Sequence, residues 1–479
     1  MATKKKSENK QASEAQKKRT TKAAPPKQAE GAAAAAPVAR RKSVAPPAAS
    51  TASRRAVVIG GMRTPFVRAF AEFMELDTIA LGVAATQALL ERFDVPRTEI
   101  DGIVWGGVIM PPYSPNLARE IALDLKLPHR VEGFTVTRAC ASGLQAVHSA
   151  VAAIERGEAD VLIAGGSDST SNAPLVLPNK AVHALAPLAF GKAKGMSDYL
   201  GVLSQLMPIT DILPRKPEIS ERTTGEVMGE CAERMAKRNG ITREAQDELS
   251  YQSHARAAAA VASGRFDDEI APVETRSGRV SADTIIRGDT SLEKLAKLKP
   301  VFDRKAGSVT AGNSSALTDG ASAVLIMSEE KARALGYKPK AAFRSFAYTS
   351  VDPADQLLIA PAIAVPMALE RAGLELSDVS LVDFHEAFAA QVLSVTQALA
   401  SDAWAKERLG RDRAVGEVDP SRFNIHGGSI AIGHPFGATG ARMVTTMANE
   451  LANSDAETAV LGICAAGGIG AGAVMERVD

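Results

Sequence analysis

Short apolar runs alternate with helix-forming runs along most of this chain, and this alternation constrains the fold more than any other feature. Residues 56–61 and 102–109 are rich in valine, isoleucine and glycine, which is typical of buried strands. Between them, residues 77–93 carry apolar side chains at helical spacing. This alternation predicts an α/β protein built from layers of helices and sheet.

The same plan occurs in both halves of the chain. In the first half, residues 133–137 are a predicted strand, a helix follows and ends at Gly157, and residues 161–166 return as a strand. The second half has a predicted strand at 380–385, helices at 386–400 and from about 442 to 451, and a strand at 457–466. The two halves therefore look like duplicated α/β units.

Composition divides the chain into four predicted regions. The segment between the halves is richer in proline and charge, with one clear helical run at 243–263, and we interpret it as an inserted lobe. The predicted regions are a basic tail at 1–54, an N-terminal half at 55–171 completed by 301–335, a loop lobe at 172–300 and a C-terminal half at 336–479.

The basic tail differs in charge from the rest of the chain. The first 55 residues hold 14 lysines and arginines against three glutamates, whereas the remaining residues carry a net charge of −10. The tail contains no leucine, isoleucine or aromatic residue, so it buries too little apolar surface to offset the entropy of ordering. We expect a disordered, solvated tail. The alternative is that the tail is attracted to polyanions. Nucleic-acid binding is not expected, however, because the tail has neither aromatic side chains nor a folded nucleic-acid-binding domain.

The remaining composition narrows the class of protein. With 46% hydrophobic and 23% charged residues, the chain is typical of a globular protein. Its longest apolar run, around residues 360–369, contains two prolines and is too short to span a membrane. The three cysteines are widely spaced without a CxxC pair, so neither a disulfide framework nor a cysteine-based zinc site is predicted. We expect a reducing, cytoplasmic location.

Four reactive side chains fall at the same kind of position in this pattern. Cys140, His385, His434 and Cys464 lie at the ends of predicted strands or in turns that lead into helices. In open α/β sheets, that edge binds ligands. Cys140 also stands at the start of a predicted helix, where the helix dipole and free amides favour a nucleophilic thiolate. The alternative interpretation of Cys140 is a small buried hydrophobe.

The other candidates carry less information by themselves. His434 lies between glycine and proline in a polar turn, so it could act as a base for Cys140 or as a donor to a carbonyl oxygen. His385 ends an apolar strand and fits a structural role as well as a catalytic one. Cys231 lies in a helical stretch and is assigned to packing. Too few residues follow the glycines at 467–472 for a dinucleotide fold, so NAD binding is not expected.

Five motifs, in order, resemble those of the thiolase family. They are TRACASGLQA at 137–146, GSVTAGNSSALTDGASAV at 307–324, HEAFAAQ at 385–391, GGSIAIGHPFGATGAR at 427–442 and CAAGGIGAG at 464–472. The resemblance covers nearly everything from about Arg55 to Asp479. It implies duplicated α/β halves in αβαβα layers with an inserted lobe, a homodimer or tetramer, and acyl exchange between acyl-CoA and coenzyme A.

The resemblance also implies catalytic roles. Cys140 would be the acylated nucleophile and His434 its base, while Cys464 would move a proton at the α-carbon of the acetyl unit. One oxyanion hole would consist of His434 and a water held by His385. The second would consist of the backbone amides of Cys140 and Ala466.

Substrate-binding positions follow from the same resemblance. Ser315 and Phe388 match positions that contact the pantetheine arm of the substrate in similar enzymes. No metal or redox cofactor is implied, because coenzyme A is itself a substrate.

Two departures from the common thiolase pattern indicate a branch. Thr137 and His385 replace asparagines, which resembles the β subunit of the trifunctional enzyme of fatty-acid oxidation. This favours a 3-ketoacyl-CoA thiolase of β-oxidation, and a partner hydratase/dehydrogenase subunit is possible. Residues 198–212 could be an apolar loop that meets such a partner or a membrane surface, or they could pack within the lobe.

Other functions remain open at this point. An acetoacetyl-CoA-forming thiolase has the same motifs, and a ketoacyl synthase shares the fold and the nucleophilic cysteine. Cys464 disfavours the synthase, because a decarboxylating enzyme needs no carbon acid/base there. The non-enzymatic alternative is an inactive acyl-CoA-binding protein with a basic anchoring tail, and the intact Cys140, His434 and Cys464 argue against it.

Overall fold

The computed structural model describes residues 54–215 and 220–478. The predicted tail at 1–54 therefore lies outside the described residues, apart from Arg54. Within these ranges, no helix combines the length and apolar character that crossing a membrane requires.

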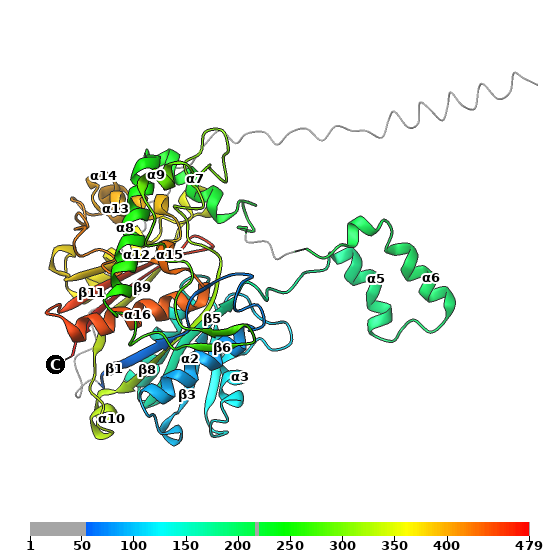
Figure 1. Cartoon of the computed structure of the whole chain (residues 1–479), viewed down its shortest axis with the longest axis horizontal. Coiled ribbons are helices and arrows are strands. Elements are labelled where there is room, and N and C mark those ends of the chain that lie inside the picture. The colour runs from blue at the N-terminus through cyan, green and yellow to red at the C-terminus, as the bar shows by residue number, and fades with distance from the viewer. Residues whose placement is uncertain (1–53, 216–219, 479) are drawn as a thin grey trace, which may run out of the picture. The chain divides into compact units, whose positions relative to one another are not determined.

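A ten-stranded mixed sheet takes strands from both halves of the chain (Figure 1). Its order is β10-β11-β12-β9-β1-β8-β5-β3-β4, and β2 pairs with the first residues of β8. The strands are β1 (Ala56–Arg63), β2 (Val67–Arg68), β3 (Gly102–Gly106), β4 (Glu132–Val136), β5 (Val161–Ser169), β8 (Thr318–Ser328), β9 (Ala341–Ser350), β10 (Leu381–Phe384), β11 (Thr458–Ala465) and β12 (Ile469–Arg477). A separate hairpin joins β6 (Val273–Thr275) and β7 (Gly278–Val280).

The strand pairings repeat between the two halves. In the first half, β3 runs parallel to β5, β5 antiparallel to β8, and β8 antiparallel to β1. In the second half, β10 runs parallel to β11, β11 antiparallel to β12, and β12 antiparallel to β9. The predicted duplication of α/β units is therefore confirmed. The two halves join where Val57 and Val58 of β1 pair with Ala342 and Ala341 of β9.

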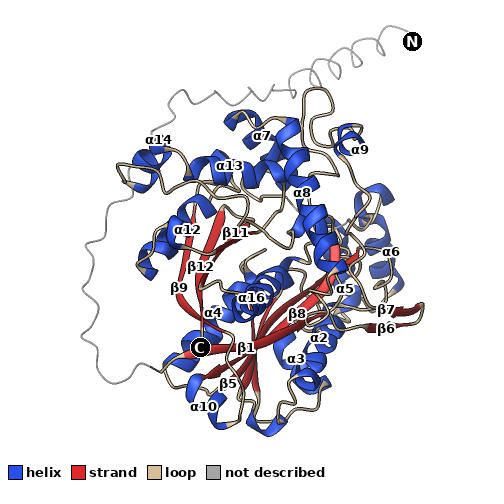
Figure 2. Cartoon of the chain, turned by 60° about the vertical axis from the view of Figure 1, so that its left-hand side comes forward, coloured by secondary structure: helices blue, strands red, loops and turns tan. Residues whose placement is uncertain are grey.

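Helices lie in three layers about this sheet. Figure 2 shows α4 and α16 between the strands of the two halves. Helices α2 and α3 cover the N-terminal strands, and α12 covers the C-terminal strands with α13 packed against it. A separate cluster of buried apolar side chains fills each interface between a helix layer and the strands. These helices are α2 (Thr78–Arg92), α3 (Leu117–Asp124), α4 (Ser142–Glu155), α12 (Pro361–Ala372), α13 (Ala389–Leu399) and α16 (Phe436–Asn453). The αβαβα layering matches the prediction.

The remaining helices are shorter or belong to the segment between the halves. They are α5 (Asn179–Ala189), α6 (Met196–Gln205), α7 (Met228–Asn239), α8 (Arg243–Ala262), α9 (Leu292–Ala296), α10 (Glu329–Ala334), α11 (Pro353–Gln356), α14 (Asp402–Trp404) and α15 (Ser429–Ile432). Side-chain caps begin several of them, as where Thr242 accepts a hydrogen bond from the amide of Ala245 at the start of α8.

Helix α16 begins at Phe436, earlier than the sequence predicted. A Cβ atom on Gly166 of β5 would lie 2.0 Å from the carbonyl oxygen of Gly437. One on Gly440 would lie 2.4 Å from the amide nitrogen of Leu144 in α4. The predicted start near residue 442 was wrong because the glycines of this stretch allow close packing within the helix rather than forming a turn.

The apolar stretch at 198–212 is mostly helical rather than an irregular loop. It contains most of α6, and the short 3₁₀ helix η2 (Ile209–Ile212) follows. Leu200, Leu203 and Ile209 are exposed there. Contact of this segment with a partner subunit or a membrane stays a prediction.

Candidate active site

Cys140 lies in the tight connection between β4 and α4. Ala139 adopts a left-handed backbone conformation, with φ of 45°, which an L residue adopts only at some cost in free energy. Ser142 stabilises this turn, because its hydroxyl accepts a hydrogen bond from the amide of Arg138 at 2.8 Å and donates one to the carbonyl of Ala139 at 2.6 Å. The turn places Cys140 directly before the first residues of α4, as the sequence predicted.

The Cys140 thiol is not a preformed thiolate. Burial of the sulfur raises its pKa to about 12, and this effect outweighs the backbone amides of Ala466 and of Cys140 itself, which lower the pKa. The expectation that the helix start would favour the thiolate is therefore wrong for the unliganded protein. Because the Ala466 amide lowers this pKa, the predicted oxyanion donor acts on the predicted nucleophile.

His434 is held in position by two threonines. Its amide donates a hydrogen bond to the hydroxyl of Thr318 at 2.8 Å, and its Nδ1 lies 2.7 Å from the hydroxyl of Thr439. The preceding Gly433 has φ of 109°, and a Cβ atom there would lie 2.9 Å from Thr318. Burial lowers the pKa of His434 to about 3, and the charge of Arg442 adds to this. The imidazole is therefore neutral at neutral pH.

His385 directly follows β10 and is fully buried. Its amide donates a hydrogen bond to the carbonyl of Gly462 in β11, and its Nδ1 lies 2.9 Å from the hydroxyl of Ser429. Burial lowers its pKa well below the usual range, and the neighbouring His434 and Arg442 lower it further. His385 is therefore also a neutral imidazole.

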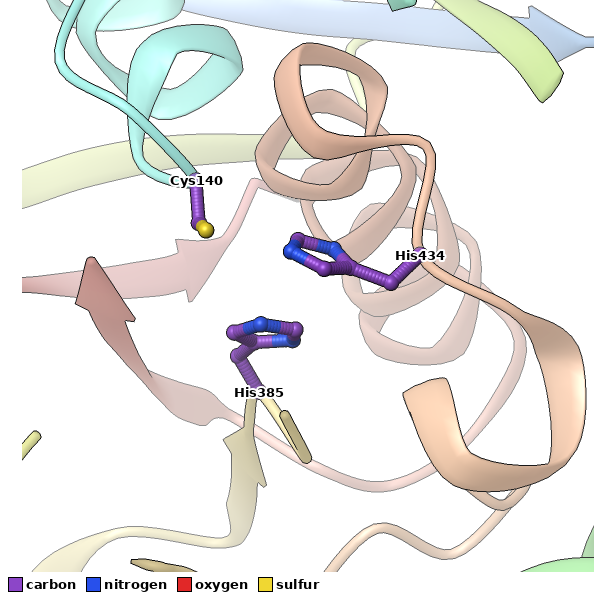
Figure 3. A group of neighbouring side chains, drawn as sticks. All are labelled: Cys140, His385 and His434. Atoms are coloured by element: carbon purple, nitrogen blue, oxygen red, sulfur yellow. The ribbon is translucent and has the colours of Figure 1, made fainter. Parts of the chain in front are cut away.

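The structure brings Cys140, His385 and His434 together from three distant parts of the chain (Figure 3). Their sulfur and nitrogen atoms lie within 4.8 Å of one another. The two rings are 4.0 Å apart between centroids. In the described structure, neither Nε2 atom has a hydrogen-bond partner, although both are buried. Two neutral imidazoles and a thiol thus face a common point, which suits binding of a polar reacting group.

Cys464 lies near the end of β11 and belongs to the same site. Burial raises the pKa of its thiol well above the usual range, and the next largest effect comes from the charge of Cys140. A charge on Cys140 therefore acts on the Cys464 thiol. The backbone amide of Ala387, two residues after His385, lowers the pKa of Cys464 and opposes the effect of burial. The predicted convergence is confirmed for Cys140, His385 and His434, and the electrostatic effect of Cys140 on Cys464 agrees with a nearby position for the fourth side chain.

A buried polar network behind the histidines was not predicted from the sequence. Glu386 accepts hydrogen bonds from the Ser253 hydroxyl and the Asn424 amide, both at 2.7 Å, and from the backbone amide of Ile430 at 3.2 Å. This ties the strand end of His385 to the segment that contains Ser429. Glu386 follows His385 directly in the sequence, but its partners lie far along the chain.

Asp168 has a similar supporting role. Its carboxylate accepts hydrogen bonds from the amide of Gly437, at 2.6 Å, and from the amides of Val108 and Ile109. Burial raises its pKa to about 6, and the backbone donors oppose this shift. Because Gly437 lies in the first turn of α16, Asp168 helps to fix the helix that follows His434. Asp168 lies near the end of β5, and this position at a strand end is the sequence signal that could have identified it as a site residue.

Ser315 and Phe388 lie on adjacent segments near the site. The amide of Ser315 donates a hydrogen bond to the carbonyl of Ala387 at 2.9 Å, and Ser314 forms a β-bridge with Phe388. Both residues are half-buried. Their contact with a pantetheine arm stays a prediction. Cys231 is buried in α7, in agreement with its assignment to packing.

Comparisons with known proteins agree with this architecture. Two family models match consecutive parts of the chain, "Thiolase, N-terminal domain" at residues 56–330 and "Thiolase, C-terminal domain" at 337–477. The 3-ketoacyl-CoA thiolase of Aliivibrio fischeri is 44% identical over 421 residues, which cover 88% of this chain and 95% of that protein. The 3-ketoacyl-CoA thiolase of Escherichia coli has the same identity and covers 96% of its length.

Solved structures give the same assignment. The acetyl-CoA acetyltransferase of Bacillus anthracis superposes with a TM-score of 0.76 at 32% identity, covering 90% of this chain and 100% of that one. Human mitochondrial 3-ketoacyl-CoA thiolase superposes with a TM-score of 0.75 at 30% identity over the same shares of the two chains. With both family models matched in order and the thiol and imidazole groups converging as described, the chain belongs to the thiolase family.

Proposed function

We propose that this protein is a 3-ketoacyl-CoA thiolase, an acyltransferase that uses coenzyme A to cleave 3-ketoacyl-CoA into acetyl-CoA and an acyl-CoA shortened by two carbons. The support is the 44% identity to curated 3-ketoacyl-CoA thiolases together with the convergence of Cys140, His385, His434 and Cys464. Degradation of fatty acids by β-oxidation is the setting that suits this reaction.

In the first step, Cys140 becomes acylated. Its sulfur attacks the 3-keto carbon, and Nε2 of His434 takes the thiol proton as the S–C bond forms. Because burial disfavours both the thiolate and the imidazolium, this proton moves only as negative charge develops on the substrate oxygen. The thiol therefore stays protonated until a substrate occupies the site.

In the second step, the bond between carbons 2 and 3 breaks. The electron pair remains on carbon 2 as the enolate of acetyl-CoA, and Cys464 donates its thiol proton to that carbon. The raised pKa of Cys464 suits this role, since a thiol that resists ionisation is a proton source rather than a competing nucleophile.

In the third step, the acyl group passes to a fresh coenzyme A. His434 first passes the proton that it took from Cys140 to the Cys464 thiolate, which restores that thiol. The thiol of coenzyme A then transfers its proton to His434, attacks the thioester carbon and displaces the Cys140 sulfur, which takes this proton back from His434. Preorganised donors should stabilise the oxyanion of each tetrahedral intermediate, each contributing on the order of 10²-fold or more to the rate. We assign the Ala466 amide to one oxyanion and the free Nε2 atoms of the two histidines to the other.

One observation carries this proposal most directly: the Cys140 sulfur and one ring nitrogen each of His385 and His434 lie within 4.8 Å of one another, and both Nε2 atoms are buried without a partner in the described structure. The test is a CoA-dependent cleavage assay over a series of 3-ketoacyl-CoA chain lengths, with acetyl-CoA condensation measured alongside it. We expect cleavage of medium and long chains to exceed condensation. Absence of CoA-dependent cleavage at every chain length would contradict the proposal.

An acetoacetyl-CoA-forming thiolase is the second candidate. It is favoured by the similarity to the acetyl-CoA acetyltransferase of Bacillus anthracis, at 32% identity. The same assay separates the two functions, because this alternative predicts activity confined to the four-carbon substrate.

The oligomeric state, cellular location and partners of the enzyme stay predictions. We propose a homodimer or tetramer in the cytoplasm, with acyl-CoA and coenzyme A as its ligands and a hydratase/dehydrogenase subunit as a possible partner. The proposed steps use the four side chains and coenzyme A alone. Size-exclusion chromatography with light scattering tests the oligomeric state.

A further inference from the structure

The active-site side chains that the proposed reaction uses also match the donor set of a metal site. A sulfur from Cys140 and one nitrogen each from His385 and His434 lie within 4.8 Å of one another. In the proposed reaction both imidazoles act on the substrate oxygen, so another ligand of these nitrogens would compete with the substrate. In the described structure, both Nε2 atoms are buried and lack a hydrogen-bond partner. Buried polar atoms of this kind usually have a partner, so the pair points to a ligand.

We propose that Cys140, His385 and His434 bind a thiophilic divalent cation such as Zn²⁺, which blocks the nucleophile while it is bound. Thiolate and imidazole are the ligands that zinc prefers, and three protein ligands leave the fourth tetrahedral position to water. Ligand atoms around tetrahedral zinc lie roughly 3.3–3.6 Å apart, as follows from its usual bond lengths. Movements of about 1 Å would therefore bring the three atoms into place.

The surroundings of the histidines fit this ligand. Metal-binding imidazoles usually hydrogen-bond through their second nitrogen, which orients the ring. Nδ1 of His385 lies 2.9 Å from the Ser429 hydroxyl, and Nδ1 of His434 lies 2.7 Å from the Thr439 hydroxyl. In the proposed tautomer, each Nδ1–H donates to the hydroxyl and each Nε2 presents its lone pair to the cation.

Binding involves proton release without electron transfer. The S–H bond of Cys140 is replaced by an S–metal bond, and the proton passes to solvent. The sulfur can then form no thioester, so the cation and the acyl group exclude each other. The widely spaced cysteines gave no sign of this site, because two of its three ligands are histidines and all come from separate segments.

The primary test uses Co²⁺ as a spectroscopic probe on the intact protein, and it needs no substrate. We expect one equivalent of Co²⁺ to produce tetrahedral absorption with a sulfur-to-cobalt charge-transfer band. Cys140→Ser should lose the charge-transfer band, and His385→Ala should lower the affinity. The matched control Cys231→Ala should bind cobalt like the wild type. Retention of the band in Cys140→Ser would overturn the proposal.

A second measurement separates ligation from general damage to the fold. Ser429→Ala removes only the hydroxyl beside Nδ1 of His385, and we expect it to weaken Co²⁺ binding roughly 10–100-fold. Zn²⁺ should also protect Cys140, but not Cys231, from alkylation in peptide mass spectra of the wild type. Alkylation of Cys140 at an unchanged rate in the presence of excess Zn²⁺ would refute the site. Because neither readout depends on turnover, a negative result here leaves the proposed thiolase activity untouched.

Discussion

The imidazole rings of His385 and His434 lie 4.0 Å apart between centroids and are tilted by 41°. A hydroxyl beside each Nδ1 fixes the orientation of each ring. Burial lowers both pKa values, so the rings approach closely as neutral groups rather than as repelling cations. This pairing brings the end of β10 and the turn before α16 to one point in front of Cys140.

Replacement of the proposed nucleophile should abolish the covalent intermediate. We expect Cys140→Ala to show no mass increase after mixing with 3-ketoacyl-CoA and to lose thiolysis, because burial keeps the Cys464 thiol protonated and so a poor nucleophile. Intact-protein mass spectrometry checks this, with Cys231→Ala as the matched control that should still acylate. A persistent acyl adduct in Cys140→Ala would assign the nucleophile to another residue.

Replacement of the second cysteine should separate the two halves of the reaction. Cys464→Ala should still form an acyl-enzyme from an acyl-CoA, because Cys140 and His434 are unchanged. Exchange of deuterium into the α-carbon of acetyl-CoA should fall by 10²-fold or more, on the order of one lost acid/base group. Nuclear magnetic resonance of acetyl-CoA in deuterated buffer measures the exchange. Exchange at the wild-type rate would exclude Cys464 as the acid/base.

The close contact of β5 with α16 should not tolerate a methyl group. Gly166→Ala would place a Cβ atom 2.0 Å from the carbonyl oxygen of Gly437, so we expect a loss of about 1–3 kcal/mol in the free energy of unfolding. The control is Gly201→Ala in α6, where no atom lies within 4 Å. That change should leave stability unchanged or raise it slightly, by up to about 1 kcal/mol. Urea unfolding at fixed protein concentration compares them, and equal stability of the two variants would contradict the contact.

The buried His254 should make the protein less stable in mild acid. Burial lowers its pKa from 6.5 to about 4, and its Nδ1 accepts a hydrogen bond from the amide of Arg287. The unfolded chain therefore binds this proton more readily than the folded protein. The stabilisation is complete above pH 6.5 and falls as the pH drops toward 4, reaching a loss of about 2 kcal/mol at pH 5.

The variant His254→Gln tests this pH dependence. It should lose less stability than the wild type between pH 7.5 and pH 5, because the titrating group is absent while the amide oxygen can still accept a hydrogen bond. His129→Gln, at an exposed histidine, is the matched control and should follow the wild type. Parallel curves for His254→Gln and the wild type would refute the assignment. Other groups also change the stability with pH; the raised pKa of Asp168, for example, makes the folded protein more stable as the pH falls. This contribution is the same in the wild type and the variants, so it cancels when they are compared.

Several features of the fold and the site could be predicted from local patterns. The strand before Cys140, the helix that follows it and the duplicated α/β plan depend on periodicity, which is a property of neighbouring residues. The positions of Cys140, His385, His434 and Cys464 at strand ends were predictable for the same reason. The early start of α16 was not, because the glycines at 437 and 440 are required by contacts with β5 and α4 that no local pattern contains.

The sequence itself thus determined the succession of strands and helices along the chain, the four reactive side chains and their motifs, whereas the order of the strands in the sheet came from the tertiary structure. The tertiary structure also decided the chemistry of these side chains. Enclosure of the Cys140 sulfur raises its pKa, although its position at a helix start had suggested a thiolate. The free energy of a charge depends on every dipole and apolar atom around it, and those atoms come from segments hundreds of residues apart. The same convergence creates the two unpartnered Nε2 atoms beside a thiol, and with them the proposed metal site.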